Sequence, residues 1–231
     1  AHTIDIAVHS LKDLPTELPK GLTLGAVLPR AEFRDALVSV NGKKLSELSS
    51  NDVIATSSLR RKSALLAYNP HFKIIDIRGN VDTRLAKMRD GYCDAMVMAA
   101  AGLQRLGFDE HITEILDEYT IMPAVAQGII AIECRTADEN LRAVLQQINH
   151  IPTWQTALAE RAFLNAMHGG CQLPLGCVSV ISAQNIELSG YIATVDGTDV
   201  LRFVNRGSIH TPEIVGKSLA QLFYEAGAER I

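Results

Sequence analysis

The sequence is poor in cysteine. Its 231 residues contain four cysteines, at positions 93, 134, 171 and 177. This density is too low for the disulfide scaffold of a small secreted domain, so that class is excluded. Only Cys171 and Cys177 lie close together, and their spacing to His168 matches no zinc-binding pattern. We therefore expect free thiols, a reducing compartment and no metal site.

Long apolar runs and an excess of positive charge are also absent. No run approaches the roughly 20 residues of a membrane helix. The formal net charge is −4, which provides no basic field for nucleic acid. We expect neither a membrane nor a nucleic-acid partner, and any anion site must be built locally. The N-terminal AHTIDIAVHS does not begin with Met and resembles neither a signal nor a transit peptide, so we expect it to lie inside a domain.

Short apolar segments alternate with helical patterns over the first two-thirds of the chain. Residues 56–58, Thr-Ser-Ser, supply N-cap side chains for a helix that Pro70 ends. The alternation predicts an α/β fold with helices packed on a mainly parallel sheet. The expected strands are 4–8, 22–27, 35–40, 53–55, 73–77, 95–99 and 129–133, and the expected helices are 59–68, 82–90, 102–106 and one over 141–148.

The pattern changes after residues 150–152, His-Ile-Pro. Strand-like segments at 178–181, 186–193 and 200–206 are separated by turn sequences and enclosed by two helices. This arrangement predicts a small α+β domain at the C-terminus. Upstream, the charged run PRAEFRD at 29–35 is a candidate crossing between domains.

Arginines occupy unusual places at two expected strand-to-helix junctions. Arg60 and Arg61 fall in the first turn of the helix after residues 56–58, while Arg78 precedes and Arg84 follows the start of the next helix. Cations at a helix N-terminus oppose the helix dipole, at a cost of roughly 0.3–1 kcal/mol each. A bound anion reverses that effect. Solvated surface charge is the alternative for any one of them, but four together favour a polyanion site.

The run His9-Ser10-Leu11-Lys12-Asp13 follows the end of the first expected strand. An adjacent Lys and Asp usually form a surface pair of little energetic value. In an arginine-rich cleft, Asp13 would instead be the lone carboxylate among cations, suited to stabilise a developing positive charge and to move protons. For His9 we favour a structural role.

Cys171 follows two glycines on an expected turn. Such a thiol has the exposure and space to carry a bulky adduct, although a buried inert cysteine is the alternative. The chain provides no convincing Cys–His–Asp relay around it. Cys93, Cys134 and Cys177 lie in or beside strand-like segments, and we expect them in the core.

Several of these segments, taken in order, resemble the porphobilinogen deaminase (hydroxymethylbilane synthase) family. The matching runs are DIAVHSLKDLP, ATSSLRR, IRGNVDTRL, AAAGLQRLG, MPAVAQGIIAIECR and GGCQLPLG, spread over residues 5–176. The resemblance implies two α/β domains of the type II periplasmic-binding-protein kind, joined by hinges, and a small α+β domain. The implied boundaries are 1–28 with 127–149, then 29–126, then 150–231. The family carries a further N-terminal segment, so domain 1 is expected to be incomplete.

The resemblance also implies residue roles. Cys171 would anchor a dipyrromethane cofactor through a thioether, and Asp13 would be the catalytic carboxylate, assisting loss of ammonia and stabilising cationic azafulvene and pyrrole intermediates. The cofactor's acetate and propionate groups would bind Lys12, Thr56, Ser57, Ser58, Arg60 and Arg61. Carboxylates of incoming substrate and growing chain would bind Arg78, Asn80, Arg84, Arg105 and Gln127. Ala126 stands where the family commonly has glycine.

The implied reaction joins four porphobilinogen molecules stepwise, releases ammonia each time and ends in hydrolysis to hydroxymethylbilane. The resemblance further implies a cytoplasmic monomer. Two alternatives remain: a non-enzymatic anion-binding protein of the periplasmic-binding type, and an inactive fragment of the enzyme. A covalent adduct on Cys171 distinguishes the enzyme from the binding protein.

Overall fold

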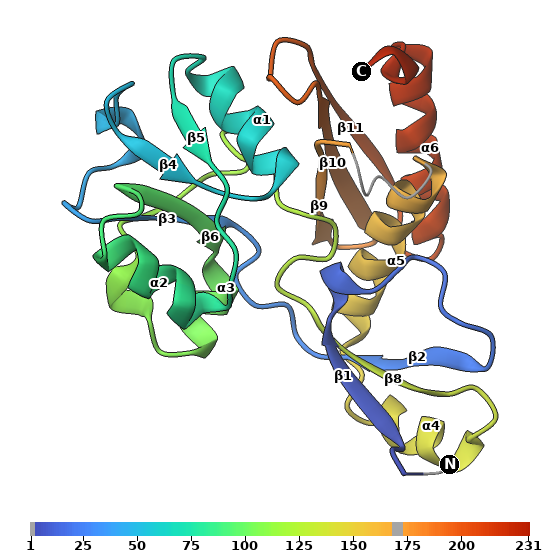
Figure 1. Cartoon of the computed structure of the whole chain (residues 1–231). Coiled ribbons are helices and arrows are strands. Elements are labelled where there is room, and N and C mark those ends of the chain that lie inside the picture. Colours follow the sequence, from blue (N-terminus) through green and yellow to red (C-terminus); the bar gives the residue numbers. More distant parts are fainter. Residues whose placement is uncertain (1–2, 168–172) are drawn as a thin grey trace.

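The residues that the structure describes form three separate β-sheets, each with its own helices (Figure 1). The structure is a computed structural model that describes residues 3–167 and 173–231. The expected α/β class with a smaller C-terminal α+β part is confirmed. None of the helices formed by the described residues has the length and apolar character needed to cross a bilayer.

The largest sheet has five strands in the order β5-β4-β6-β3-β7. Its strands are β3 (Asp35–Ser39), β4 (Val53–Ala55), β5 (Lys73–Ile75), β6 (Ala95–Ala99) and β7 (Glu114–Ile115), and its helices are α1 (Leu59–Tyr68), α2 (Val81–Arg89) and α3 (Ala100–Arg105). Strand β4 pairs in parallel with β5 and β6, as expected for strands joined by helical crossovers. Strand β3, by contrast, pairs antiparallel with both β6 and β7.

The three-stranded sheet, in the order β1-β8-β2, is wholly antiparallel. It consists of β1 (Ile6–Ser10), β2 (Leu22–Val27) and β8 (Ile130–Arg135), with α4 (Glu139–Gln146) packed on β2. The expectation of a mainly parallel sheet holds for the five-stranded sheet, where β4, β5, β6 and β7 run in one direction and β3 opposes them, but it is wrong for this three-stranded sheet. Helical crossovers connect β4, β5, β6 and β7, whereas β3 and β8 enter their sheets through irregular connections, and apolar alternation does not fix strand direction.

The C-terminal sheet, in the order β11-β10-β9, is also antiparallel. Its strands β9 (Leu175–Ser182), β10 (Asn185–Ala193) and β11 (Val200–Ser208) extend the three expected segments, and α5 (Ile151–Ala166) and α6 (Pro212–Glu225) cover one face. Phe163 and Phe223 are fully buried in that layer. On the other face Tyr191 is buried against α1, where its hydroxyl lies 3.1 Å from Ser63 Oγ.

Residues 28–34, within the run 29–35 predicted as a crossing between domains, form an irregular connection between β2 and β3, which lie in two different sheets. It runs beside a second connection that leads into β8, and Ala31 N donates to Gly128 O at 3.0 Å. A Cβ at Gly128, where φ is +86°, would lie 2.8 Å from Ala31 O. The glycine thus permits both the left-handed backbone and the close approach of the two crossings.

Candidate functional site

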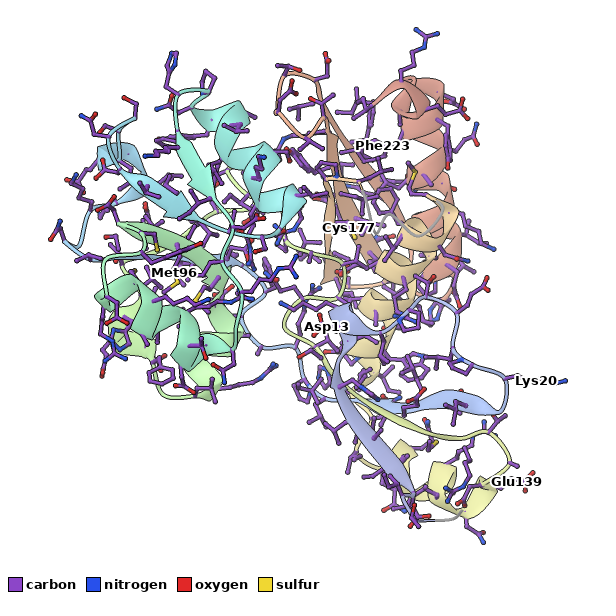
Figure 2. All side chains as sticks on the ribbon, viewed as in Figure 1. Asp13, Lys20, Met96, Glu139, Cys177 and Phe223 are labelled. Atoms are coloured by element: carbon purple, nitrogen blue, oxygen red, sulfur yellow. The ribbon has the colours of Figure 1, made fainter. Side chains whose placement is uncertain are left out.

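Asp13 ends a short 3-10 helix, Leu11–Asp13, that directly follows β1. Leu11 is fully buried and its N–H donates to Ile129 O at 2.9 Å, which fixes the start of this turn. The next two residues, Lys12 and Asp13, are exposed. Figure 2 shows Asp13 near the middle of the molecule, at the inner end of β1. His9 contacts Glu133, with Nε2 and Oε2 3.2 Å apart, consistent with its expected structural role.

Arg60 and Arg61 lie in the first turn of α1, as predicted, but both are buried. Ser58 caps the helix by accepting a hydrogen bond from Arg61 N. The two guanidinium groups converge on the fully buried carboxylate of Asp35. Arg60 Nη1 is 2.9 Å from Asp35 Oδ2, and Arg61 Nη2 is 2.8 Å from Asp35 Oδ1. Arg60 also donates to Met122 O. The alternative of solvated surface charge is therefore wrong for these two arginines.

Burial by itself would raise the pKa of Asp35, but the charges of Arg60 and Arg61 overcome it and hold this pKa well below its usual range. Burial also lowers the pKa of Arg60, against the opposing effect of Asp35. Asp35 is thus a permanent anion. The expectation that Asp13 is the lone carboxylate among the cations is wrong, because Asp35 lies between them.

Gln127 links this cluster to Lys12. Its Nε2 donates to Asp35 Oδ1 at 2.8 Å, and its Oε1 accepts from Lys12 Nζ at 3.3 Å. Although Lys12 keeps exposed surface, desolvation of its ammonium and the charge of Arg61 lower its pKa to about 8. We call Lys12, Asp35, Arg60, Arg61 and Gln127 the Asp35 cluster.

The Asp35 cluster carries more positive than negative charge. One carboxylate faces two guanidinium groups and one ammonium, a formal sum of +2 with Lys12 protonated. Arg61 Nε is also buried without a hydrogen-bond partner among the described residues. A buried donor without a partner is costly, and an anionic ligand would both occupy it and balance the charge. These residues fit a carboxylate-bearing group such as dipyrromethane.

Two other predicted site residues, Arg84 and Arg105, lie close to the cluster, and Thr56 and Ser57 lie just before α1. Burial, followed by the charge of Arg61, lowers the pKa of Arg84, whose Nε donates to Gly79 O at 2.8 Å. Arg105 Nη2 donates to Gly128 O at 2.8 Å, next to Gln127. Thr56 is buried, and Ser57 Oγ donates to Ile77 O at 2.7 Å.

Two predicted residues are not brought into the cluster by any contact among the described residues. Arg78 is exposed, and Asn80 caps α2 by accepting from Thr83 N at 2.9 Å. Cys171 lies outside the described residues, so the structure does not test its predicted role. The other three cysteines are buried as expected. Burial raises the pKa of Cys93 to about 11, so its thiol stays protonated.

A second buried carboxylate, Glu160 on α5, was not predicted. Arg30 binds it with Nη1 2.5 Å from Oε1, and Ala126 N donates to Oε2 at 2.7 Å. Ser179 donates to Oε1 through both its N–H, at 2.9 Å, and its hydroxyl, at 2.7 Å. We call Glu160, Arg30, Ala126 and Ser179 the Glu160 cluster. It joins both crossings to α5 and β9.

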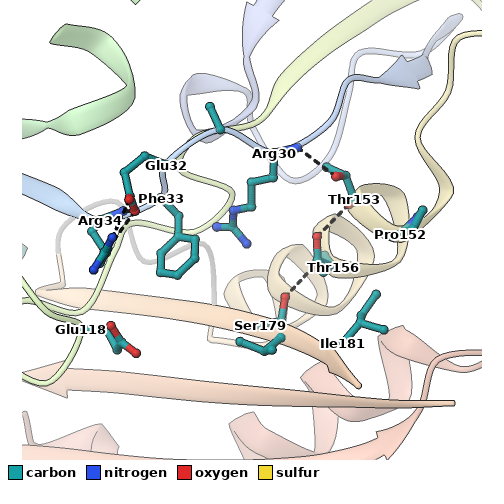
Figure 3. A pocket seen from close by; sticks show the side chains of 12 residues that line it. Arg30, Glu32, Phe33, Arg34, Glu118, Pro152, Thr153, Thr156, Ser179 and Ile181 are labelled. Atoms are coloured by element: carbon teal, nitrogen blue, oxygen red, sulfur yellow. Dashed lines mark hydrogen bonds and ion pairs between the residues drawn. The ribbon is translucent and has the colours of Figure 1, made fainter. Parts of the chain in front are cut away.

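A cavity of about 580 Å³ lies beside the Glu160 cluster (Figure 3). Phe33, Glu118, Thr156 and Ile181 are among its lining residues, and none of the predicted site residues lines it. Its two arginines are already paired, Arg30 with Glu160 and Arg34 with Glu32. No group of three or more potential metal ligands occurs among the described residues. The Asp35 cluster therefore remains the better candidate site.

Comparisons with known proteins identify the family of this chain. The family model "Porphobilinogen deaminase, dipyromethane cofactor binding domain" matches residues 1–143, and "Porphobilinogen deaminase, C-terminal domain" matches residues 154–225. A porphobilinogen deaminase of Bacillus subtilis (strain 168) is 48% identical over 228 residues, which cover 98% of this chain and 72% of that protein. The enzyme of Desulforudis audaxviator (strain MP104C) is 44% identical over 228 residues, covering 99% and 74%.

Among solved structures, the VFT2 domain of Bordetella pertussis BvgS resembles 55% of this chain and 54% of its own, with a TM-score of 0.32 and 18% identity, too low to argue from. The family models and the curated relatives, in contrast, extend over nearly the whole sequence. This chain belongs to the porphobilinogen deaminase family and contains the family's dipyrromethane cofactor binding domain.

Proposed function

We propose that this chain joins four porphobilinogen molecules stepwise and hydrolyses the product to hydroxymethylbilane. Each condensation forms one carbon–carbon bond, breaks the carbon–nitrogen bond of the substrate's aminomethyl group and releases ammonia. The observation that carries the proposal is the uncompensated positive charge of the Asp35 cluster, adjoining the turn that presents Asp13. Carboxylate-bearing pyrroles require such fixed cations.

Lys12 and Arg61 are best placed to hold the cofactor's carboxylates. Lys12 keeps exposed surface, and Arg61 has the buried donor without a protein partner among the described residues. Arg60, bound to Asp35 and Met122 O, would act mainly by keeping Asp35 charged and in place. Ser58, Thr56 and Ser57 would contribute polar contacts at the start of α1. When bound through Cys171, the dipyrromethane supplies the pyrrole carbon to which the first substrate is joined.

Asp13 is the proposed catalytic carboxylate. Asp13 is exposed and adjoins Lys12 in the sequence. A substrate whose carboxylates are held by the Asp35 cluster would therefore have the Asp13 carboxylate near its cationic nitrogen. Asp13 would stabilise the positive charge that develops as ammonia leaves, and it would take up or return a proton at a carboxylate oxygen. Asp35, buried and ion-paired on both oxygens, is unsuited to that task.

Arg84 and Arg105 are proposed to bind carboxylates of the incoming substrate and the growing chain. Arg84 is close enough to Arg61 for the two charges to repel, a repulsion that a shared anionic ligand would relieve. Gln127 would connect this region to Lys12. Arg78 and Asn80, at the start of α2, are proposed as outer contacts on the strength of the family motif alone.

We also propose the domain division 1–28 with 127–149, 29–126 and 150–231, since each part holds one of the three sheets. The first two parts would have the type II periplasmic-binding architecture. The chain is proposed to act as a cytoplasmic monomer, without nucleic-acid or membrane partners. Size-exclusion chromatography with light scattering tests the monomer directly.

The intact mass of the purified chain, beside that of its Cys171→Ser variant, is the experiment that tests the function. We expect added mass equal to two linked pyrrole units in the parent and none in the variant, together with ammonia release from porphobilinogen by the parent only. An unmodified, well-folded parent that turns over no substrate would refute the proposal. Binding of citrate by that unmodified parent would then support the anion-binding alternative.

A further inference from the structure

Arg161, on α5, reaches the loop that follows Asp13. Its Nη1 donates to Leu14 O at 3.3 Å, and its Nη2 donates to Pro15 O at 2.5 Å and to Thr16 O at 3.0 Å. Three consecutive carbonyl groups are thus bound by one guanidinium. Close by, Thr16 Oγ1 donates to Asn165 Oδ1 at 3.2 Å, one turn further along the same helix.

This use of an arginine is unusual for a surface residue. Burial lowers the pKa of Arg161, and no carboxylate in the described part of the chain lies within ion-pair distance of it. Desolvation of a cation without a counter-ion is unfavourable and must be balanced by the hydrogen bonds that the cation makes. In this structure those bonds go to the backbone at 14–16, so the interaction selects one conformation of that loop.

Without the hydrogen bonds from Arg161, the turn that carries Asp13 would be fixed mainly on its N-terminal side. On the N-terminal side, Leu11 is fully buried and its N–H donates to Ile129 O. Inside the turn, Leu14 N donates to Leu11 O at 3.2 Å. On the C-terminal side, the residues from Leu14 to the start of β2 at Leu22 form no helix or strand. Leu14 packs against the core that includes the inner face of α5, and Arg161 and Asn165 provide the side-chain hydrogen bonds from α5 to this segment.

In the sequence, Cys171 follows the same helix. Helix α5 ends at Ala166, five positions before that cysteine, and the neighbouring residue Glu160 ties α5 to both crossings through the Glu160 cluster. The guanidinium of Arg161 therefore connects the Asp13 turn to the helix that precedes the proposed attachment residue in the sequence.

We infer that Arg161 is a positioning residue that sets the place of the Asp13 carboxylate relative to the cofactor. The inference rests on the proposed roles of Asp13 and Cys171. A displacement of about 1 Å in a catalytic group can cost about a hundredfold in rate, so loss of the three bonds should reduce turnover without removing the cofactor.

The test compares Arg161→Met, which keeps most of the stem and removes the donors, with Arg161→Lys, which keeps a cation and up to three donors. Arg206→Met is the matched control, because the Arg206 side chain is 75% exposed on β11 and, among the described residues, pairs only with Glu187. We expect Arg161→Met to carry the full cofactor mass and to lose about tenfold to a hundredfold in kcat with KM nearly unchanged. Arg161→Lys should recover part of that loss, and Arg206→Met should match the parent.

Two readouts separate positioning from a general structural role. In an Asp13→Asn background, Arg161→Met should reduce the residual kcat no further, because its effect acts through Asp13. Equal losses in both backgrounds would overturn the inference. Hydrogen exchange at the Leu14 amide should also accelerate at least tenfold in Arg161→Met and not in Arg206→Met.

The exchange measurement does not require turnover, so it tests whether Arg161 holds the loop at 14–16 even in a chain without cofactor. Unchanged exchange at Leu14 would overturn the inference whatever the activity. A parent without cofactor or turnover, yet with faster Leu14 exchange in Arg161→Met, would refute the proposed function and leave the contact between Arg161 and the loop established.

Discussion

Among the described residues, Asp35 and Glu160 are the two fully buried carboxylates, and both are bound by arginine, but their surroundings differ in charge. Glu160 has one arginine and accepts its other hydrogen bonds from neutral donors, the N–H of Ala126 and the N–H and hydroxyl of Ser179. Asp35 has two arginines, with the ammonium of Lys12 one amide side chain away.

The difference shows how a structural ion pair is distinguished from a binding site. The Glu160 cluster is complete, since its charges cancel and its carboxylate oxygens are satisfied by protein donors. The Asp35 cluster is incomplete, since positive charge exceeds negative charge and Arg61 Nε has no partner in the described part of the protein. Of these two clusters, only the Asp35 cluster would gain binding free energy from an anionic ligand.

The largest expected effect on stability comes from the complete cluster. Glu160→Gln leaves Arg30 buried without a counter-ion, and loss of one partner from a buried pair costs roughly 3–5 kcal/mol of unfolding free energy. Urea denaturation measures this loss. Asp35→Asn should also be destabilising. When both substitutions are made in a Cys171→Ser background, added citrate should raise the Tm of Asp35→Asn more than the Tm of Glu160→Gln, because only the Asp35 cluster has excess positive charge for citrate to bind. An equal response of the two variants would contradict the comparison.

The largest expected effect on rate comes from a carboxylate in neither cluster. Asp13→Asn should keep the cofactor mass and lose about 10²–10³ in kcat, the usual cost of removing one preorganised electrostatic group at a reacting centre. Single-turnover assays with porphobilinogen, normalised to cofactor content, provide the measurement. Near-normal turnover by this variant would assign the chemistry elsewhere.

The charge of Lys12 should make the incomplete cluster sensitive to pH. Its pKa of about 8 means that the ammonium is protonated at pH 7 and mostly neutral at pH 9. Citrate binding to the Cys171→Ser chain should therefore weaken by roughly tenfold across that interval, the effect of losing a charge-assisted contact of about 1.5 kcal/mol. Calorimetry at both pH values measures it, and Lys12→Met should show a flat profile.

The same shift predicts the opposite trend for the stability of the ligand-free chain. Between pH 8 and the ordinary lysine pKa of 10.5, the unfolded chain binds more protons at position 12 than the folded chain. The contribution of Lys12 to unfolding free energy therefore rises with pH over this window. A difference in this slope between the parent and Lys12→Met checks the sign.

The smallest expected effect lies in the complete cluster, at Ala126. This residue has a φ of +58°, in the left-handed region, while its N–H donates to Glu160. The left-handed conformation costs an alanine about 1–2 kcal/mol, and glycine avoids this cost. Glycine also increases the conformational entropy of the unfolded chain, which cancels part of the gain in stability. Ala126→Gly should therefore raise Tm by up to a few degrees, measured by calorimetry. A lowered Tm would show that the Ala126 methyl group is needed for packing.

Periodicity and capping patterns were sufficient to locate most elements. The expected strands 22–27, 53–55 and 95–99 match β2, β4 and β6 in full, and the helix over 59–68 matches α1. Strand direction could not be predicted, because β3 has the same apolar pattern whether its neighbours run parallel or antiparallel. The two-residue strand β7 is also too short to produce a periodic signal.

The candidate site was predicted in part. Cations at helix starts pointed to Arg60 and Arg61, but their counter-ion Asp35 lies 25 positions before Arg60 and is brought beside it only by the sheet. Its position at the start of the apolar run DALVS was the available signal, since a charge at a buried strand end requires a partner. Glu160 gave a similar signal, because it lies on the buried face of α5.

Helix α5 also constrains how this protein can change in evolution. Successive residues on a helix point about 100° apart, and the neighbours Glu160 and Arg161 use that angle to reach the crossings and the loop after Asp13. Substitutions at either position alter one contact at a time. A single inserted or deleted residue upstream in α5 would rotate both side chains away together, so length changes in related sequences should be confined to the segments outside this helix.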